Sequence, residues 1–170
     1  MDVFTDKFMP ALKLKDFVKA EAALEEFKLE ETNTHYMWAK SLLYYWKKQL
    51  DKANEILSEI IDKGEDQNKI CQHTRAENYL NDRQYIKALA DLNAILSDNT
   101  PKTVEIYHEY CWFIKAFILA SLGEHEFNDV IQKIDNEFDT FVIDGMYDKP
   151  ALIRIYNANK KPIRAKPRLE

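Results

Sequence analysis

A pattern that returns after 35 residues constrains the fold of this chain more than any other feature of its sequence. It pairs similar residues at Ser41/Ala76, Tyr44/Tyr79, Leu50/Tyr85, Ala53/Ala88, Leu57/Leu92 and Ile60/Ile95. In the later copy Tyr85, Ala88, Leu92 and Ile95 step by 3, 4 and 3 residues, so they share one face of an α-helix. A small residue within such a face lets a neighbouring helix approach closely. The sequence therefore predicts helices that pack in repeated pairs.

The composition favours the same fold class. The 170 residues include only 3 Gly and 5 Pro, which supply little of the turn chemistry that an all-β chain needs. Hydrophobic residues make up 46% of the chain, enough for a packed core. We expect an all-α fold of antiparallel helix hairpins with about eight helices. The helices are expected near residues 2–13, 16–31, 35–48, 50–62, 67–81, 83–97, 102–122 and 127–138, with a further short helix near 148–156.

The two ends of the chain differ in charge. Residues 1–148 carry 17 Lys/Arg against 28 acids, a net charge of −11, whereas residues 149–170 carry seven against one, a net charge of +6. We therefore expect a helical repeat domain over residues 1–147 and a C-terminal segment over 148–170. This segment ends in a Lys/Pro-rich extended tail from residue 157, whose basic residues are Lys160, Lys161, Arg164, Lys166 and Arg168.

The basic tail has three interpretations. The first is a solubilising end, the second a peptide that binds nucleic acid or acidic lipid, and the third a segment that docks on an acidic protein surface. The acidic body of the chain repels phosphate, so nucleic acid is not expected to be the main ligand.

The residues that suggest chemistry do not converge. Cys71, His73, His108 and Cys111 are the nearest approach to a metal site or to a Cys/His nucleophile pair. If helical, Cys71 and His73 project about 200° apart and cannot grip one ion. The three glycines are isolated and form no phosphate-binding loop. We expect no enzyme activity, no metal and no cofactor.

The sequence also bears on the compartment. No run approaches the ~18 apolar residues of a membrane-spanning helix, and the opening residues MDVFTDKF lack the pattern of a secretory signal. Cys71 and Cys111 are expected as reduced thiols. We expect an intracellular protein, cytoplasmic or nuclear, that does not contact a membrane.

The repeats resemble the tetratricopeptide family. The best match is Ala76, Tyr79, Tyr85, Ala88 and Pro101; Trp38, Tyr44 and Ala53 give a weaker one, and Trp112, Ala116, Gly123 and Phe127 a third with altered spacing. The resemblance covers roughly residues 14–138. It implies a right-handed superhelix whose first helices line a concave groove that binds a peptide or a partner's helix. Other solenoids of helix hairpins remain open as alternatives.

The resemblance also implies which residues line that groove. They are His35, Trp38, Leu42 and Tyr45 in one repeat, Ile70, His73, Glu77 and Leu80 in the next, and Tyr110, Phe113 and Phe117 in the irregular one. Because aromatic residues at helical spacing also form cores, a core role for each aromatic residue stays open.

The implied groove is aromatic and apolar and suits an apolar peptide or an amphipathic helix. The function predicted on this basis is a protein–protein interaction module, an adaptor or assembly subunit of an intracellular complex, with self-association into a homodimer as a further expectation. The alternative is a nucleic-acid accessory factor that acts through the basic tail.

Overall fold

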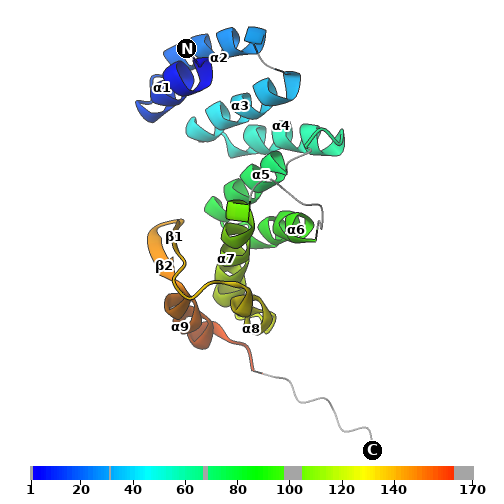
Figure 1. Ribbon diagram of the computed structural model, residues 1–170, viewed down its shortest axis with the longest axis vertical. Helices are drawn as coiled ribbons and strands as arrows, with labels where there is room; N and C mark the ends of the chain where they lie inside the picture. Colours follow the sequence, from blue (N-terminus) through cyan, green and yellow to red (C-terminus); the bar gives the residue numbers. More distant parts are fainter. Residues whose placement is uncertain (1, 31, 67–68, 98–104, 163–170) are drawn as a thin grey trace, which may run out of the picture. The chain divides into compact units, whose positions relative to one another are not determined.

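A computed structural model describes residues 2–30, 32–66, 69–97 and 105–162 (Figure 1). These ranges are mostly helical and contain one two-stranded sheet, so the predicted all-α class and the predicted number of helices are confirmed. The chain divides into two compact units, Met1–Asp91 and Leu92–Glu170.

The first unit is a succession of short helices. It begins with a π-helical turn, η1 (Phe4–Phe8), followed by α1 (Met9–Lys13), α2 (Phe17–Glu30), α3 (Asn33–Trp46), α4 (Leu50–Asp62), α5 (Ile70–Asn81) and the start of α6 (Tyr85–Leu96). Consecutive helices pack on one another: α2 on α3, α3 on α4 and α4 on α5, while η1 and α1 pack on α2. The predicted first helix is thus split into a π-helical turn and α1, with Pro10 in the first turn of α1.

One turn geometry recurs between the paired helices. Lys15, Lys48 and Arg83 all have left-handed φ values, of 57°, 62° and 57°, and each lies two residues before the next helix. At each turn the left-handed residue donates its N–H to the carbonyl three residues back, and the following residue donates to the carbonyl five residues back. This Schellman-type pair of bonds satisfies the last carbonyls of the preceding helix. The helix hairpin is therefore a repeated structural unit.

The small residues of the repeat pattern lie on the buried faces of their helices. Ala20, Ala53 and Ala88 occupy equivalent positions in α2, α4 and α6 and are fully buried. Larger apolar residues of the same helix faces, such as Leu24 and Leu57, are buried beside them. A side chain larger than alanine at these positions would force the helices apart.

The second unit is built around α7 (Glu105–Leu122). It continues with α8 (Phe127–Val130), a 3₁₀ turn η2 (Ile131–Lys133), strands β1 (Asp139–Val142) and β2 (Gly145–Asp148), and α9 (Lys149–Asn159). The strands form an antiparallel hairpin in which Thr140 pairs with Tyr147 and Phe141 with Met146. Helices α8 and α9 both pack on α7, and the hairpin adjoins α9 (Figure 1).

The structure differs from the sequence-based expectation for this part of the chain in three places. The helix predicted over 127–138 stops at Lys133, because Ile134 adopts an extended backbone with ψ of 133°. The hairpin over 139–148 was not predicted. The extended segment predicted from residue 157 is helical through Asn159, and residues 102–104 and 163–170 lie outside the described ranges.

Candidate functional site

The predicted groove residues of the first unit lie on α3 and α5, which are joined by side-chain hydrogen bonds. The Trp38 indole donates from Nε1 to Thr74 Oγ1 at 3.2 Å and stacks on the Phe4 ring at a centroid distance of 5.3 Å. Two helical turns further along both helices, Asn81 donates from Nδ2 to the Tyr45 hydroxyl at 3.2 Å. Trp38 and Tyr45 are half-buried, and part of their surface contacts the chain's own residues.

The other predicted residues of this face differ in exposure. His35 is exposed at the start of α3, Leu42 is half-buried against the core, and Leu80 is buried. His73 Nδ1 lies 3.6 Å from Glu77 Oε2. Burial lowers the pKa of His73, and the nearby Glu77 carboxylate opposes part of that shift.

The predicted groove residues of the second unit belong mainly to its core. Phe113 is 0% exposed and Phe117 is also buried, with the Phe138 and Tyr147 rings packed against them at 5.5 and 5.1 Å. The prediction that these two phenylalanines line an exposed groove is therefore wrong, because the β-hairpin and the segment before it cover α7. Tyr110 is half-buried.

Cys71, His73, His108 and Cys111 are the residues considered above for metal or nucleophile chemistry. Within the described ranges, no three His, Cys, Asp or Glu side chains gather in a way that would hold a metal ion. Cys71 and Cys111 are both buried. Burial, with a smaller contribution from Asp66, raises the pKa of Cys71 to about 12, so its thiol is protonated at neutral pH.

Only the first two basic residues of the tail are described. Lys160 is exposed directly after α9, and the Lys161 ammonium group forms an ion pair with Glu124. Arg164, Lys166 and Arg168 lie outside the described residues.

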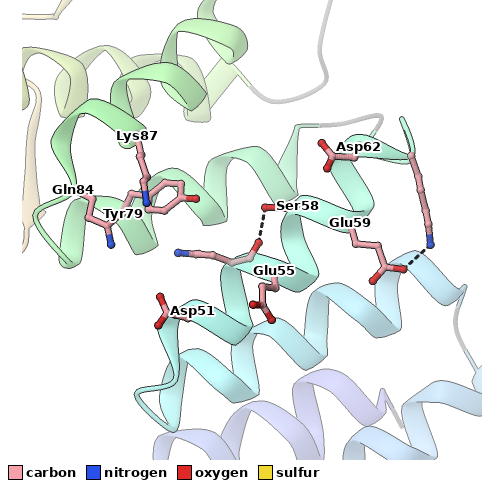
Figure 2. A pocket seen from close by; sticks show the side chains of 10 residues that line it. Asp51, Glu55, Ser58, Glu59, Asp62, Tyr79, Gln84 and Lys87 are labelled. Atoms are coloured by element: carbon pink, nitrogen blue, oxygen red, sulfur yellow. Dashed lines mark hydrogen bonds and ion pairs between the residues drawn. The ribbon is translucent and has the colours of Figure 1, made fainter.

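A groove along α4, which residues of α5 and α6 also line, was not predicted from the sequence. It has a volume of about 790 Å³, and we call it the α4 groove. Figure 2 shows acidic side chains along α4, facing Tyr79 of α5, Gln84 just before α6, and Lys87 of α6. Its lining comprises Asp51, Asn54, Glu55, Ser58, Glu59, Asp62, Lys63, Tyr79, Gln84 and Lys87.

The acidic wall of the α4 groove is a regular line of carboxylates. Asp51, Glu55, Glu59 and Asp62 step by 4, 4 and 3 residues, so they share one face of α4 with about 6 Å of helix rise per step of four. Glu59 is paired with Lys63 at 2.6 Å, and this hydrogen bond lowers the pKa of Glu59. Within the described part of the chain, Asp51, Glu55 and Asp62 form no ion pair. The wall therefore carries three carboxylates outside any described ion pair, of which Asp62 lies near enough to Arg75 to help raise the pKa of that guanidinium.

A buried polar network fixes the elements around the groove. The Arg75 guanidinium of α5 donates from Nε and Nη2 to the Asp91 carboxylate of α6 at 2.8 and 2.6 Å, and from Nη1 to Ser58 Oγ of α4 at 2.7 Å. Asp91 raises the pKa of Arg75, so the guanidinium stays charged. Asn78 donates to Asn54 at 2.9 Å. Side chains of three helices are thus bonded to one another beside the groove.

The second wall of the groove is aromatic and polar. The Lys87 ammonium group lies 5.3 Å from the centre of the Tyr79 ring. This distance is within the range of a cation–π contact. The Gln84 side chain also lines this wall and bonds with Asp82. The groove thus offers negative charge on one side and, on the other, an aromatic ring, an amide and the Lys87 ammonium group.

Comparisons with protein-family models, with curated proteins and with solved structures find no match to this chain. Among the helices that the structure describes, none combines the length and the apolar character needed to cross a membrane.

Proposed function

We propose that this chain is a protein-binding module, an adaptor or assembly subunit of an intracellular complex, that holds a basic segment of its partner in the α4 groove. The observation that carries this proposal is the line of carboxylates along a groove of about 790 Å³, three of them outside any described ion pair. A partner with Lys or Arg side chains neutralises these groups, and an Arg side chain forms two parallel hydrogen bonds with a carboxylate.

The spacing of the carboxylates favours an extended partner segment. Along the axis of α4 the steps from Asp51 to Glu55 and on to Glu59 are each about 6 Å, the step from Glu59 to Asp62 is about 4.5 Å, and the whole line spans about 16 Å. In an extended chain every second residue points the same way, at intervals of about 6.6 Å. Basic residues at alternate positions therefore meet successive carboxylates, while the opposite side of the segment, which must be uncharged or acidic, faces Tyr79, Gln84 and the Lys87 ammonium group.

The helix-hairpin repeats support this class of function. The left-handed turns at Lys15, Lys48 and Arg83, and the buried alanines at 20, 53 and 88, recur at intervals of 33 and 35 residues. Both features agree with the resemblance to tetratricopeptide repeats. We therefore also propose that these helix hairpins form the predicted right-handed superhelix. Stacked helix hairpins of this kind present long surfaces to protein partners.

The α4 groove suits a protein ligand better than the α3–α5 face does. Trp38 and Tyr45 on that face already contact Phe4, Thr74 and Asn81. We therefore propose a basic peptide in place of the apolar peptide expected from the sequence. The same carboxylates repel phosphate groups, so the groove disfavours nucleic acid.

Fluorescence anisotropy tests the proposal with the full chain and a fluorescein-labelled peptide that has Lys or Arg at alternate positions. The test variant combines Asp51→Asn, Glu55→Gln and Asp62→Asn, which keep side-chain shape and remove charge. We expect it to bind the peptide at least about tenfold more weakly, because three attractive pairs are lost. Binding to the unaltered chain should weaken as salt is added.

A matched control separates the groove from the net charge of the protein. Asp129→Asn, Glu137→Gln and Asp139→Asn together remove three exposed carboxylates of the second unit and give the same net charge. This control should bind the peptide like the unaltered chain. Equal weakening in both variants, or no binding by the unaltered chain at low salt, contradicts the proposal.

A further inference from the structure

The basic tail contains a charge pattern that occurs once in the sequence. Arg164, Lys166 and Arg168 occupy alternate positions, and no other three basic residues of the chain are spaced in this way. The residues between them, Ala165 and Pro167, are uncharged. Residues 163–170 lie outside the described ranges, so it is their sequence that bears on what they bind. In an extended backbone the three basic side chains point to one side and the uncharged ones to the other.

The α4 groove has the complementary pattern. Asp51, Glu55 and Glu59 are spaced by about 6 Å along α4, and Asp62 follows about 4.5 Å beyond Glu59. Alternate residues of an extended chain are about 6.6 Å apart, close to these intervals. The facing wall of the groove carries the Lys87 ammonium group, which repels a basic side chain (Figure 2). A segment that fits therefore has basic residues at alternate positions and uncharged residues between them.

We propose that the α4 groove holds residues 164–168 of a second copy of this chain. This inference rests on the proposed function of the groove and names one basic segment that it binds. From residue 164 to residue 168 an extended backbone covers about 13 Å, which fits within the carboxylate line of about 16 Å. The contacts are Arg168 with Asp51, Lys166 with Glu55, and Arg164 with both Glu59 and Asp62.

Two other charges bear on how the tail lies along α4. Glu170, the one acidic residue of 149–170, continues the alternate spacing. In the arrangement above the tail runs antiparallel to α4, so Glu170 lies beyond Asp51, past the end of the carboxylate line. Lys63 is paired with Glu59 at 2.6 Å, but both side chains are exposed and such pairs are weak. Lys63 therefore does not prevent a tail Arg side chain from reaching Glu59.

The length of the tail favours a second copy over the same chain. Lys161 is held in the second unit, where its N–H donates to the Gly123 carbonyl at 3.2 Å and its ammonium group pairs with Glu124. Only three residue steps separate Lys161 from Arg164, a reach of about 10 Å. Docking within one chain therefore requires one particular placement of the second unit against α4, whereas the tail of another copy requires none.

The groove and the tail are different surfaces, so the contact between copies is heterologous. Each copy offers one groove and one tail. A copy altered only in its groove can therefore still join, through its tail, a copy altered only in its tail. Because the contact depends on exposed charges, we expect self-association to weaken as salt is added.

Sedimentation equilibrium of the full chain at low salt, from micromolar to hundreds of micromolar concentration, tests the contact. The tail variant combines Arg164→Gln, Lys166→Gln and Arg168→Gln, and the groove variant is the Asp51→Asn, Glu55→Gln, Asp62→Asn chain described above. We expect each to self-associate at least about tenfold more weakly than the unaltered chain. An equimolar mixture of the two variants should form a 1:1 complex. The matched control removes three other exposed basic groups, with Lys13→Gln, Lys133→Gln and Arg154→Gln, and should associate like the unaltered chain.

Peptide binding by the tail variant separates this inference from the proposed function. Fluorescence anisotropy with the labelled peptide of alternate Lys or Arg residues should show that the groove of the tail variant is intact. If the peptide binds but the unaltered chain stays monomeric at every concentration, the second-copy contact is overturned and the proposed function stands. The contact is equally overturned by a tail variant that associates like the unaltered chain, or by a mixture that forms no complex. A chain that binds no such peptide at low salt overturns both.

Discussion

The end of α7 offers the most direct test of how the second unit is held together. Gly123 has a left-handed φ of 66°, and a Cβ atom placed on it would lie 2.0 Å from the Asn159 carbonyl oxygen at the end of α9. Gly64, after α4, has a similar φ of 71°, but a Cβ there would meet nothing within 4 Å. The substitutions Gly123→Ala and Gly64→Ala therefore share the cost of a left-handed alanine and differ in the clash.

The expected magnitudes follow from these two surroundings. A left-handed alanine costs about 1 kcal/mol, and this is the whole effect expected of Gly64→Ala. At Gly123 the obstacle is backbone, which cannot turn away as a flexible side chain can, so overpacking adds about 1–3 kcal/mol. Relief requires α9 to move, which weakens the bond from the Lys161 N–H to the Gly123 carbonyl and the stacking of Tyr156 on Phe127. We expect a loss of about 3 kcal/mol for Gly123→Ala.

Urea unfolding followed by circular dichroism measures the difference. With a urea slope of about 2 kcal/mol/M, Gly123→Ala should lower the midpoint of its transition by about 1.5 M and Gly64→Ala by about 0.5 M. Hydrogen exchange provides the local measurement, since only Gly123→Ala should reduce the protection of amides in α9. Equal midpoint shifts for the two variants, or unchanged protection of α9, would refute the packing described for this junction.

Two further predictions concern buried ionisable groups of the first unit. Asp91→Ala removes the carboxylate that pairs with the buried Arg75 guanidinium and should lower the free energy of unfolding by about 3–5 kcal/mol. The double variant Arg75→Leu with Asp91→Leu should regain most of that loss. Urea unfolding measures both variants, and a double variant as unstable as Asp91→Ala contradicts the prediction. Because burial lowers the pKa of His73, the unfolded chain binds its proton first as pH falls. The unfolding free energy of the unaltered chain should therefore decline below about pH 6.5 more than that of His73→Gln, and parallel pH profiles would contradict this.

The helices of the first unit were predictable because their packing is encoded locally. Ala53 and Ala88 sit in faces with a clear helical period, and the same faces are buried in α4 and α6. The turns were less visible, because their left-handed positions are occupied by Lys15, Lys48 and Arg83 in place of the glycine that usually marks such a turn. The 35-residue repeat predicted only that a turn must separate each pair of helices.

The second unit was harder to predict because its hairpin depends on distant contacts. Each strand has four residues, and Asp139 faces Asp148 across the ladder, an unfavourable pair of like charges. The sequence does contain a turn signal at Asp144-Gly145 between residues that favour strands. Such a short hairpin is marginal by itself. It is held where Tyr147 packs on Phe117, and that same contact converts Phe117 from a predicted surface residue into a core residue.

The α4 groove shows which part of a binding surface a sequence can reveal. The carboxylates at Asp51, Glu55 and Asp62 lie opposite the buried face of α4, and their helical spacing could be read directly from the sequence. The hollow beside them could not, because it depends on where α6 lies against α4. That position is set by the Arg75–Asp91 pair, which is buried, joins two helices and also bonds α4 through Ser58. Periodicity identifies the faces of single helices, but a partner recognises the space between helices, and here buried charge defines that space.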